Sequence, residues 1–374
     1  ETNIRYFDIL TGKTDREEEA LLVRANNRTY RSRGIQTRAE YRFNLNEFFF
    51  DLEFGLRYHA DEEDRFQWDD SYSMKNKKMV LFMEGIHGTN ANRVTSANAL
   101  AGYLLAKLRY DAWTVTAGLR YEDVDLLKKD YTKEDLARSG KVRIETPNHA
   151  RVLIPGVGLH YQLMPAASVF FGIHKGFAPP SAELYQKPES SVNMELGTRV
   201  AIGNFRAELI GFYNNYSNML GSDLAASGGA GTLEQFNVGE ARVKGAEFLV
   251  QYQPLPKSCN VRLPLQVSYT YTDTEIRNSF ESHSWGNVVR GDEIPYIFKH
   301  ALNMQLGIEC KWFYANIGAR YNSDMRTSPG QGTIAEREKV PANLIFDASL
   351  NVFVNKYLTV RLNAINLTNR VYLT

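Results

Sequence analysis

The sequence predicts an all-β protein, specifically a transmembrane antiparallel up-and-down β-barrel. Three observations predict this fold class. Apolar and polar side chains alternate with period 2 along most of the chain, as in strands whose two faces meet different surroundings. Short turns alternate with long polar loops, as in a meander. Aromatic residues are abundant, with 21 Tyr, 20 Phe and 4 Trp among 374 residues, and Tyr and Trp favour membrane interfaces.

Composition and charge exclude three other classes of protein. The chain has 44 basic and 43 acidic side chains, so it has no basic footprint for a nucleic acid. Hydrophobic residues make up 43% of it, which excludes disorder as the main state. No window approaches the roughly 18 apolar residues of a membrane-spanning helix. The first residues lack a signal-peptide pattern, so we expect any such peptide to have been removed or to lie outside this sequence.

The alternation predicts fourteen strands. In the first one, the polar side chains of Gln36, Arg38, Glu40 and Arg42 alternate with apolar or small ones. The strands are expected at 32–43, 47–58, 97–109, 113–125, 151–163, 168–176, 192–202, 205–217, 237–252, 264–275, 299–309, 312–322, 343–353 and 357–366. Roughly ten residues suffice for a tilted strand to cross a bilayer, whereas soluble strands average about five or six. A soluble β-sandwich or propeller is the alternative.

The connections give the strands their directions. Short turns alternate with long polar stretches, which lie at about 60–96, 126–150, 177–191, 218–236, 276–298 and 324–342. Outer-membrane barrels have short periplasmic turns and long extracellular loops, so we expect the long stretches outside the cell. Residues 78–88 look like another strand, but counting it would move the turn at Asp111 to the loop side. We therefore assign them to an extracellular loop, where they can form a hairpin.

Aromatic residues are placed as two girdles. One set directly follows short turns: Trp113, Phe205, Trp312 and Phe313. A second set follows about eight residues later along the strands: Tyr58, Tyr121, Tyr213 and Tyr321. Such belts mark the two interfaces of a membrane barrel.

The predicted directions place both chain ends outside the cell. The first strand runs from the loop side to the turn side, and the last one runs back. Single-chain bacterial barrels have an even number of strands, and their termini are expected in the periplasm. We therefore expect at least one strand to be missing from each end, so that residues 1–374 are a fragment of one barrel domain.

Four segments, in order, resemble those of TonB-dependent outer-membrane receptors. Residues 171–180, FGIHKGFAPP, resemble the KGFxPP segment of that family. Residues 194–199, MELGTR, are similar to its ELGxR strand, and residues 243–247, VKGAE, to its KGxE strand. Residues 362–372, LNAINLTNRVY, resemble its penultimate strand, VxNLxxxxY. Residues 294–302 make the ferric citrate type of receptor the most similar.

This resemblance implies a 22-stranded barrel that is plugged by an N-terminal domain. The chain would supply about strands 8–21, without the plug, its TonB box, about seven strands and the closing strand. It would lie in the outer membrane of a Gram-negative bacterium, in contact with its lipid. It would serve active uptake of a small iron chelate, ferric citrate or another siderophore, energised by the TonB-ExbB-ExbD complex. Haem, cobalamin or glycan receptors and a passive porin-like channel are the alternatives.

No enzyme motif is present, so we expect no catalytic residues, no cofactor and no resident metal site. The sequence lacks a GxSxG elbow, an HExxH pair and a Walker loop. Its seven His are scattered. Ser282 and His283, next to Glu281, are more typical of a solvated loop than of a triad. An outer-membrane protease or lipase is the enzymatic alternative.

Inward-facing and loop residues near the outer mouth are the candidates for ligand binding. An arginine fork can donate two hydrogen bonds to one carboxylate, which suits an anionic chelate. The candidates are His174, Arg290, Lys299, Arg320, Asn322 and Arg326. The competing interpretation is that these charges pair with one another or with the plug.

Other polar features have structural interpretations. Arg38, Glu40, Arg42, Asp51, Glu53 and Arg57 face inward on two neighbouring strands and are expected to form cross-strand ion pairs. The prolines at 179–180 end a strand because proline cannot donate to the ladder. The loop from there to Ser191 is a candidate lid, and 218–236 is a second loop that can close over a ligand.

The two cysteines are candidates for a disulfide. Cys259 falls in a periplasmic turn, and Cys310 falls at the periplasmic end of a neighbouring strand. The periplasm is oxidising, so we expect a bond between them, with two free thiols as the alternative.

Overall fold

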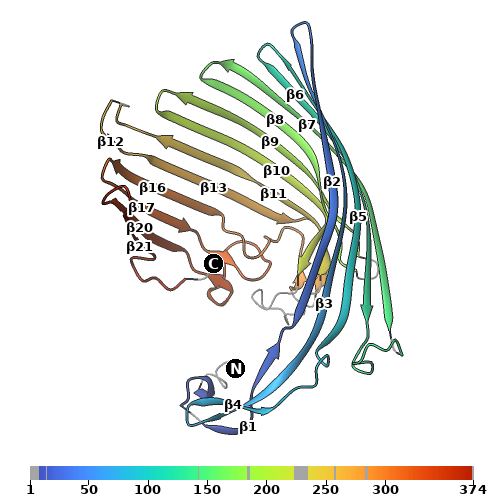
Figure 1. The fold of residues 1–374 in the computed structure, drawn as a ribbon. Helices are drawn as coiled ribbons and strands as arrows, with labels where there is room; N and C mark the ends of the chain where they lie inside the picture. Colours follow the sequence, from blue (N-terminus) through green and yellow to red (C-terminus); the bar gives the residue numbers. More distant parts are fainter. Residues whose placement is uncertain are drawn as a thin grey trace.

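The chain forms one large antiparallel sheet that curves into an open trough. The computed structural model describes residues 8–13, 15–141, 143–182, 186–222, 235–256, 258–282 and 285–372. The sheet has 17 strands, and its long strands lie side by side in chain order from β2 to β21 (Figure 1). Short turns gather at one end of the strands, and long loops gather at the other (Figure 1).

Fourteen long strands build the wall. They are β2 (Arg28–Leu45), β3 (Phe48–Lys75), β5 (Ala91–Tyr110), β6 (Trp113–Asp130), β7 (Ile144–Met164), β8 (Ala167–Ala178), β9 (Glu189–Ile202), β10 (Phe205–Ser222), β11 (Gln235–Tyr252), β13 (Leu265–Ile276), β16 (His300–Cys310), β17 (Phe313–Asn322), β20 (Asn343–Phe353) and β21 (Thr359–Ala364). They match the fourteen expected strands one for one. Within the described residues, β2 pairs only with β3 and β21 only with β20, so the sheet is open.

Left-handed residues close the short turns. Asn46, between β2 and β3, has φ of 54°, and Asp111, between β5 and β6, has φ of 50°. Gly203 takes the same conformation between β9 and β10, with φ of 58°. Asn, Asp and Gly are the residues that tolerate this region, so the sequence favours tight reversals at these places.

Several strands on the N-terminal side run farther than expected. β3 continues to Lys75 and β6 to Asp130, beyond the predicted ends at 58 and 125. The outer face is apolar up to Tyr121, whose cross-strand partner is Leu153, and it then becomes charged. The backbone ladder continues although the apolar pattern stops, so the predicted boundary marks where the outer face changes and not the end of the strand.

A three-stranded extension grows from the far end of β3. β1 (Arg16–Ala25) pairs with one edge of β3, and β4 (Lys78–Met83) pairs with the other. β4 confirms that residues 78–88 contribute to a hairpin on the loop side, which it forms with the end of β3, whereas β1 was not predicted. Ile9, Leu21 and Met74 form a small apolar cluster that ties the N-terminal residues to this extension.

The remaining elements are short and belong to the loop side or the turns. They are β12 (Val261–Arg262), β14 (Phe280–Ser282), β15 (Gly286–Val288), β18 (Met325–Arg326), β19 (Lys339–Val340) and the 3-10 turn η2 (Glu336–Glu338). Among the described residues, no helix has the length and hydropathy to span a membrane.

Candidate functional site

Three of the predicted ligand residues share one patch of the inner face, at the loop end of β16 and β17. Arg320 on β17 lies opposite Asn303 on β16, and Asn322 follows two residues later. Lys299 directly precedes β16, and its carbonyl accepts a hydrogen bond from the Thr272 N–H at 2.9 Å. Paired residues and alternate residues share a face in an antiparallel sheet, so these side chains point into the same space.

Glu293, from the loop before β16, binds two of the predicted cations. The Lys299 Nζ lies 2.6 Å from Glu293 Oε1. The Arg326 Nε donates to Glu293 Oε2 at 2.9 Å, and the same guanidinium donates to the carbonyl of Gly332. The side chain of Arg326 is only 6% exposed, against 45% for Lys299. The structure therefore brings Lys299 and Arg326 together through a carboxylate that the sequence did not single out.

The electrostatics of Glu293 follow from these contacts. Partial burial opposes its negative charge. The hydrogen bonds from Lys299 and Arg326 favour that charge more strongly, and together they hold the pKa of Glu293 below its ordinary value. Glu293 is therefore a carboxylate at neutral pH, and the cluster is a two-cation, one-anion site.

Backbone hydrogen bonds join the two loops that carry this cluster. The Tyr296 N–H donates to the carbonyl of Arg326 at 2.8 Å, and the Glu293 N–H donates to the carbonyl of Gly330 at 2.9 Å. The amide of Gln331 donates to Asp292 Oδ1 at 3.1 Å. The loop before β16 and the loop after β17 are thus fastened to each other.

A cavity of about 240 Å³ lies beside the cluster. Its polar lining, from β13, β18 and the two loops, includes Thr272, Thr274, Glu293, Lys299, Asp324 and Arg326. The cations and hydroxyl groups of this concave site are suited to an anionic ligand with several hydrogen-bonding groups, whereas its carboxylates oppose one. The threonines could have been found from the inward parity of β13, but nothing local in the sequence indicates that Glu293 folds back onto Lys299.

The other two candidates lie apart from this patch. His174 is on the inner face of β8, where its Nε2 lies 3.2 Å from the amide nitrogen of Asn193. β8 is separated from β16 by β9, β10, β11 and β13, so His174 belongs to another part of the wall. Arg290 is exposed in the loop before β16, and its carbonyl accepts a hydrogen bond from Gln331 at 3.2 Å.

Several charges of the inner wall at β2, β3 and β5 form ion pairs with one another. Asp51 binds Arg42 across β2 and β3, at 3.6 Å, and Arg109 of β5, at 2.9 Å. Glu40 binds Arg38 and Arg42 along its own strand, at 2.9 and 3.1 Å. The expected cross-strand pairing is therefore confirmed for Asp51, while Glu40 pairs along its strand.

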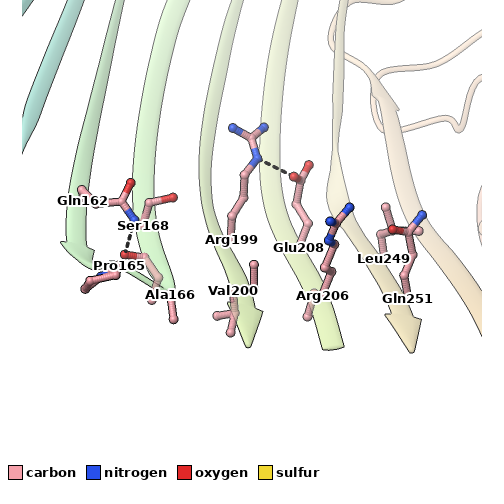
Figure 2. A pocket seen from close by; sticks show the side chains of 13 residues that line it. Gln162, Pro165, Ala166, Ser168, Arg199, Val200, Arg206, Glu208, Leu249 and Gln251 are labelled. Atoms are coloured by element: carbon pink, nitrogen blue, oxygen red, sulfur yellow. Dashed lines mark hydrogen bonds and ion pairs between the residues drawn. The ribbon is translucent and has the colours of Figure 1, made fainter. Parts of the chain in front are cut away.

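A second cavity, of about 270 Å³, lies at the turn end of β8 to β11 (Figure 2). Arg199 of β9 and Glu208 of β10 lie directly opposite each other and form an ion pair of 2.5 Å. Arg206 and Gln251 line the same cavity (Figure 2). This site is at the opposite end of the wall from the Lys299 patch, so it is not part of the predicted mouth.

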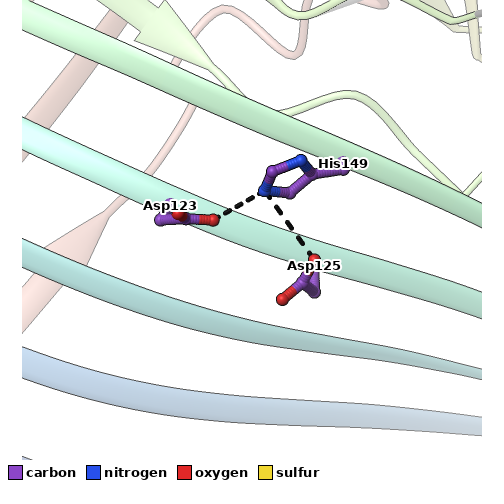
Figure 3. Close-up of side chains that lie close together, drawn as sticks. All are labelled: Asp123, Asp125 and His149. Atoms are coloured by element: carbon purple, nitrogen blue, oxygen red, sulfur yellow. Dashed lines mark hydrogen bonds and ion pairs between the residues drawn. The ribbon is translucent and has the colours of Figure 1, made fainter.

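One group of side chains has a composition that suits a metal ion. The ligand atoms of Asp123, Asp125 and His149 lie within 4.8 Å of one another (Figure 3). Asp123 already pairs with His149 at 2.6 Å and with the Arg151 Nε at 2.9 Å. All four lie on the outer face, because Tyr121 of the same strand does so and alternate residues share a face. The group is therefore outside the predicted ligand site.

The expected disulfide is absent from the structure. Cys259 and Cys310 are both free thiols. The register pairs Cys310 with Val261, two residues beyond Cys259. Strand pairing therefore brings the cysteines to the same end of the wall but does not place them opposite each other.

Parts of the two candidate lids lie outside the described residues, namely 183–185 and 223–234. The described part of the first loop is held to the wall, because the Asn148 amide donates to the carbonyls of Ser181 and Gln186 at 3.0 and 3.1 Å. His283, which was assigned to a solvated loop, also lies outside the described residues.

Comparison with known proteins agrees with this architecture. Residues 2–367 match the family model described as "TonB dependent receptor-like, beta-barrel". The unliganded ferric citrate transporter FecA shares 18% identity, with a TM-score of 0.69, over 94% of this chain and 51% of that one. The siderophore receptor PiuA from Acinetobacter baumannii shares 16%, with a TM-score of 0.72, over 94% and 54%.

The ferric-catecholate import receptor Fiu from E. coli K12 shares 17% identity, with a TM-score of 0.71, over 93% of this chain and 52% of that one. The chain thus spans about half the length of the solved structures it matches. These identities establish a shared fold, while the family match extends over nearly the whole chain. The chain belongs to the TonB-dependent receptor β-barrel family, whose members are outer-membrane receptors of Gram-negative bacteria and not enzymes.

Proposed function

We propose that this chain forms about strands 8–21 of a 22-stranded receptor that takes up a small anionic iron chelate. The inner patch of Lys299, Arg320 and Asn322 carries the proposal. Within the described residues, no ion pair engages Arg320, whose side chain is exposed on the inner face. A carboxylate ligand that enters from the loop end would meet this part of the wall first. The cation of Arg320 and the amide of Asn322 can donate hydrogen bonds to it there.

Ferric citrate is the first ligand to test, and other siderophores follow. It is a small anion with several carboxylates, and the patch supplies cationic and neutral donors. The ferric citrate transporter and the siderophore and ferric-catecholate receptors share the fold of this chain. Uptake would be energised by the TonB-ExbB-ExbD complex through segments outside this chain. Haem, cobalamin and glycans are alternative ligands, and a passive channel is the alternative mode.

The test is uptake of radiolabelled ferric citrate by cells that express the full-length receptor and lack any other route for it. R320A removes an inward cation, and we expect it to reduce uptake at limiting ligand by about tenfold, the effect of one lost charge-assisted hydrogen bond. R206A is the matched control, because it removes an arginine from the inner face at the turn end.

Unchanged uptake in R320A, or an equal loss in R206A, would contradict the assignment of the patch. Loss of uptake when TonB is deleted supports active transport. Uptake that persists without TonB would instead support the passive channel.

A further inference from the structure

We propose that Glu293 is an internal competitor of the ligand, a carboxylate that holds the cations of the mouth until an anionic chelate displaces it. This inference rests on the proposed function, because it needs an anionic ligand at this site. It assigns Glu293 the role of setting affinity and of coupling ligand entry to the release of two loops.

The contacts of Glu293 imitate those of a bound carboxylate. One oxygen accepts from Lys299 at 2.6 Å, and the other accepts from Arg326 at 2.9 Å. Charge-assisted hydrogen bonds of this length are the strong ones in proteins, and arginine binds any carboxylate in the same way. A ligand carboxylate in the position of Glu293 would satisfy the same two cations.

The exchange keeps Arg326 paired because one carboxylate replaces another. Removing Glu293 alone would leave Arg326, 6% exposed, as a buried and unpaired charge, which is strongly unfavourable. An incoming carboxylate restores that pairing. Glu293, already 20% exposed, can then turn into the adjoining 240 Å³ cavity, where Thr272 and Thr274 offer hydroxyl groups. Asp324 also lines this cavity, and its charge opposes a displaced Glu293 there, which is a cost that ligand binding must offset.

Displacement would loosen the loops because the same residues fasten them. The Arg326 guanidinium donates a hydrogen bond to the carbonyl of Gly332. The Arg326 carbonyl accepts one from the N–H of Tyr296. Glu293 holds the carbonyl of Gly330 with its N–H. A shift of Glu293 therefore disturbs contacts on both loops together.

The experiment compares E293Q with D292N in the full-length receptor. Both variants remove one negative charge at adjacent positions. Asp292 contacts Gln331 and the Val289 N–H, not the two cations. Glutamine keeps the size of Glu293 but is a weaker competitor. We expect E293Q to bind ferric citrate about tenfold more tightly than wild type, and D292N to bind no more tightly than wild type.

A second readout follows the loops directly. Hydrogen exchange of the Glu293 and Tyr296 amides should speed up when ferric citrate binds to wild type. In E293Q these amides should exchange faster even without ligand. If E293Q does not give a cooperative thermal unfolding transition, E293D replaces it, since its shortened side chain cannot span both cations and should also bind more tightly.

The outcomes separate the inference from the proposed function. Binding by wild type together with equal or weaker binding by E293Q would overturn the inference and leave the proposed function standing. Absence of ferric citrate binding to both proteins would overturn ferric citrate as the ligand and, with it, the competition proposed for Glu293. Tighter binding by E293Q with faster loop exchange supports both.

Discussion

In β5 to β7, the band between the two aromatic girdles and the rim beyond the outer girdle carry their apolar side chains on opposite faces. Within the band, outer residues such as Ala117, Leu119 and Val157 are apolar and exposed. Beyond Tyr121, the outer face carries charges, among them Asp123 and its ion-pair partners, and the inner face becomes apolar and buried.

The inner side of this rim contains a small core. Val124 and Leu126 of β6 face inward and are buried against Ala182 from the loop after β8, with Ala97 and Ala99 of β5 beside them. Similar ion pairs cover the outer face elsewhere, such as Arg31 with Glu62 at 3.2 Å and Lys244 with Asp273 at 3.3 Å.

The same strands therefore contact lipid along one part of their length and water along another. In the band, lipid contacts the outer face, so apolar side chains belong there. In the rim, water contacts the outer face, and loops that fold back make an interior of the inner face. The outer face changes from apolar to charged at Tyr121, and this change marks the membrane boundary. The ends of the strands do not mark it, because β6 continues to Asp130.

The strongest test of this boundary puts a charge on each side of it. A117R places arginine on the outer face of β6 midway between the girdles, and we expect it to lower the free energy of unfolding in lipid vesicles by about 2–4 kcal/mol. S96R places the same charge on the outer face of β5 beyond the girdle, opposite Leu127. Its cost should be about 0–1 kcal/mol, the value near an interface.

Denaturant titrations of both variants in vesicles provide the measurement. Equal costs for A117R and S96R would place the two sites in the same environment and refute the boundary at Tyr121.

A smaller effect should distinguish the two kinds of apolar residue. Leu126 of the rim core is 9% exposed, whereas Leu119 of the band is 45% exposed to the lipid side. L126A should cost about 2–3 kcal/mol, since it leaves a cavity. In L119A, lipid fills the space of the lost side chain, so no cavity forms. We expect this variant to lower the free energy of unfolding by less than about 1 kcal/mol.

Hydrogen exchange of residues near Ala182 should rise in L126A and stay unchanged in L119A. Comparable exchange in the two variants would mean that the rim core contributes no more than the lipid face does.

The sequence was sufficient for the fold because period 2 is a strong signal where lipid and lumen differ. All fourteen wall strands were predicted, and so was the hairpin at β4. The strands that ran farther than predicted have one physical cause. At Tyr58 and Tyr121 the apolar run on the outer face ends, so the pattern stopped while the backbone ladder continued to Lys75 and Asp130.

The site was predictable only in part. The alternation along a strand shows which side chains face inward, but the contacts between two loops depend on residues far apart in the sequence. Inward parity placed Lys299, Arg320 and Asn322 on one patch. Burial of Arg326 and its pairing with Glu293 depend on contacts between two loops more than 30 residues apart. No spacing in the sequence encodes such a contact, and the same is true of the separation between Cys259 and Cys310.

The smallest predicted effect is the response to acid of the contacts that Glu293 makes with Lys299 and Arg326. The pKa of Glu293 is lower in the folded protein than in the unfolded chain, so the folded state binds fewer protons there. The contribution of Glu293 to stability is complete above its unfolded pKa and is lost as the pH falls through its folded pKa. The protection factor of the Tyr296 amide, which corrects for the slower intrinsic exchange in acid, should therefore fall as the pH is lowered, while amides of the band, such as that of Leu119, stay protected. In E293Q the Tyr296 amide should exchange fast at neutral pH already and show no further acid transition. An acid transition of unchanged size in E293Q would assign the titration to a carboxylate other than Glu293.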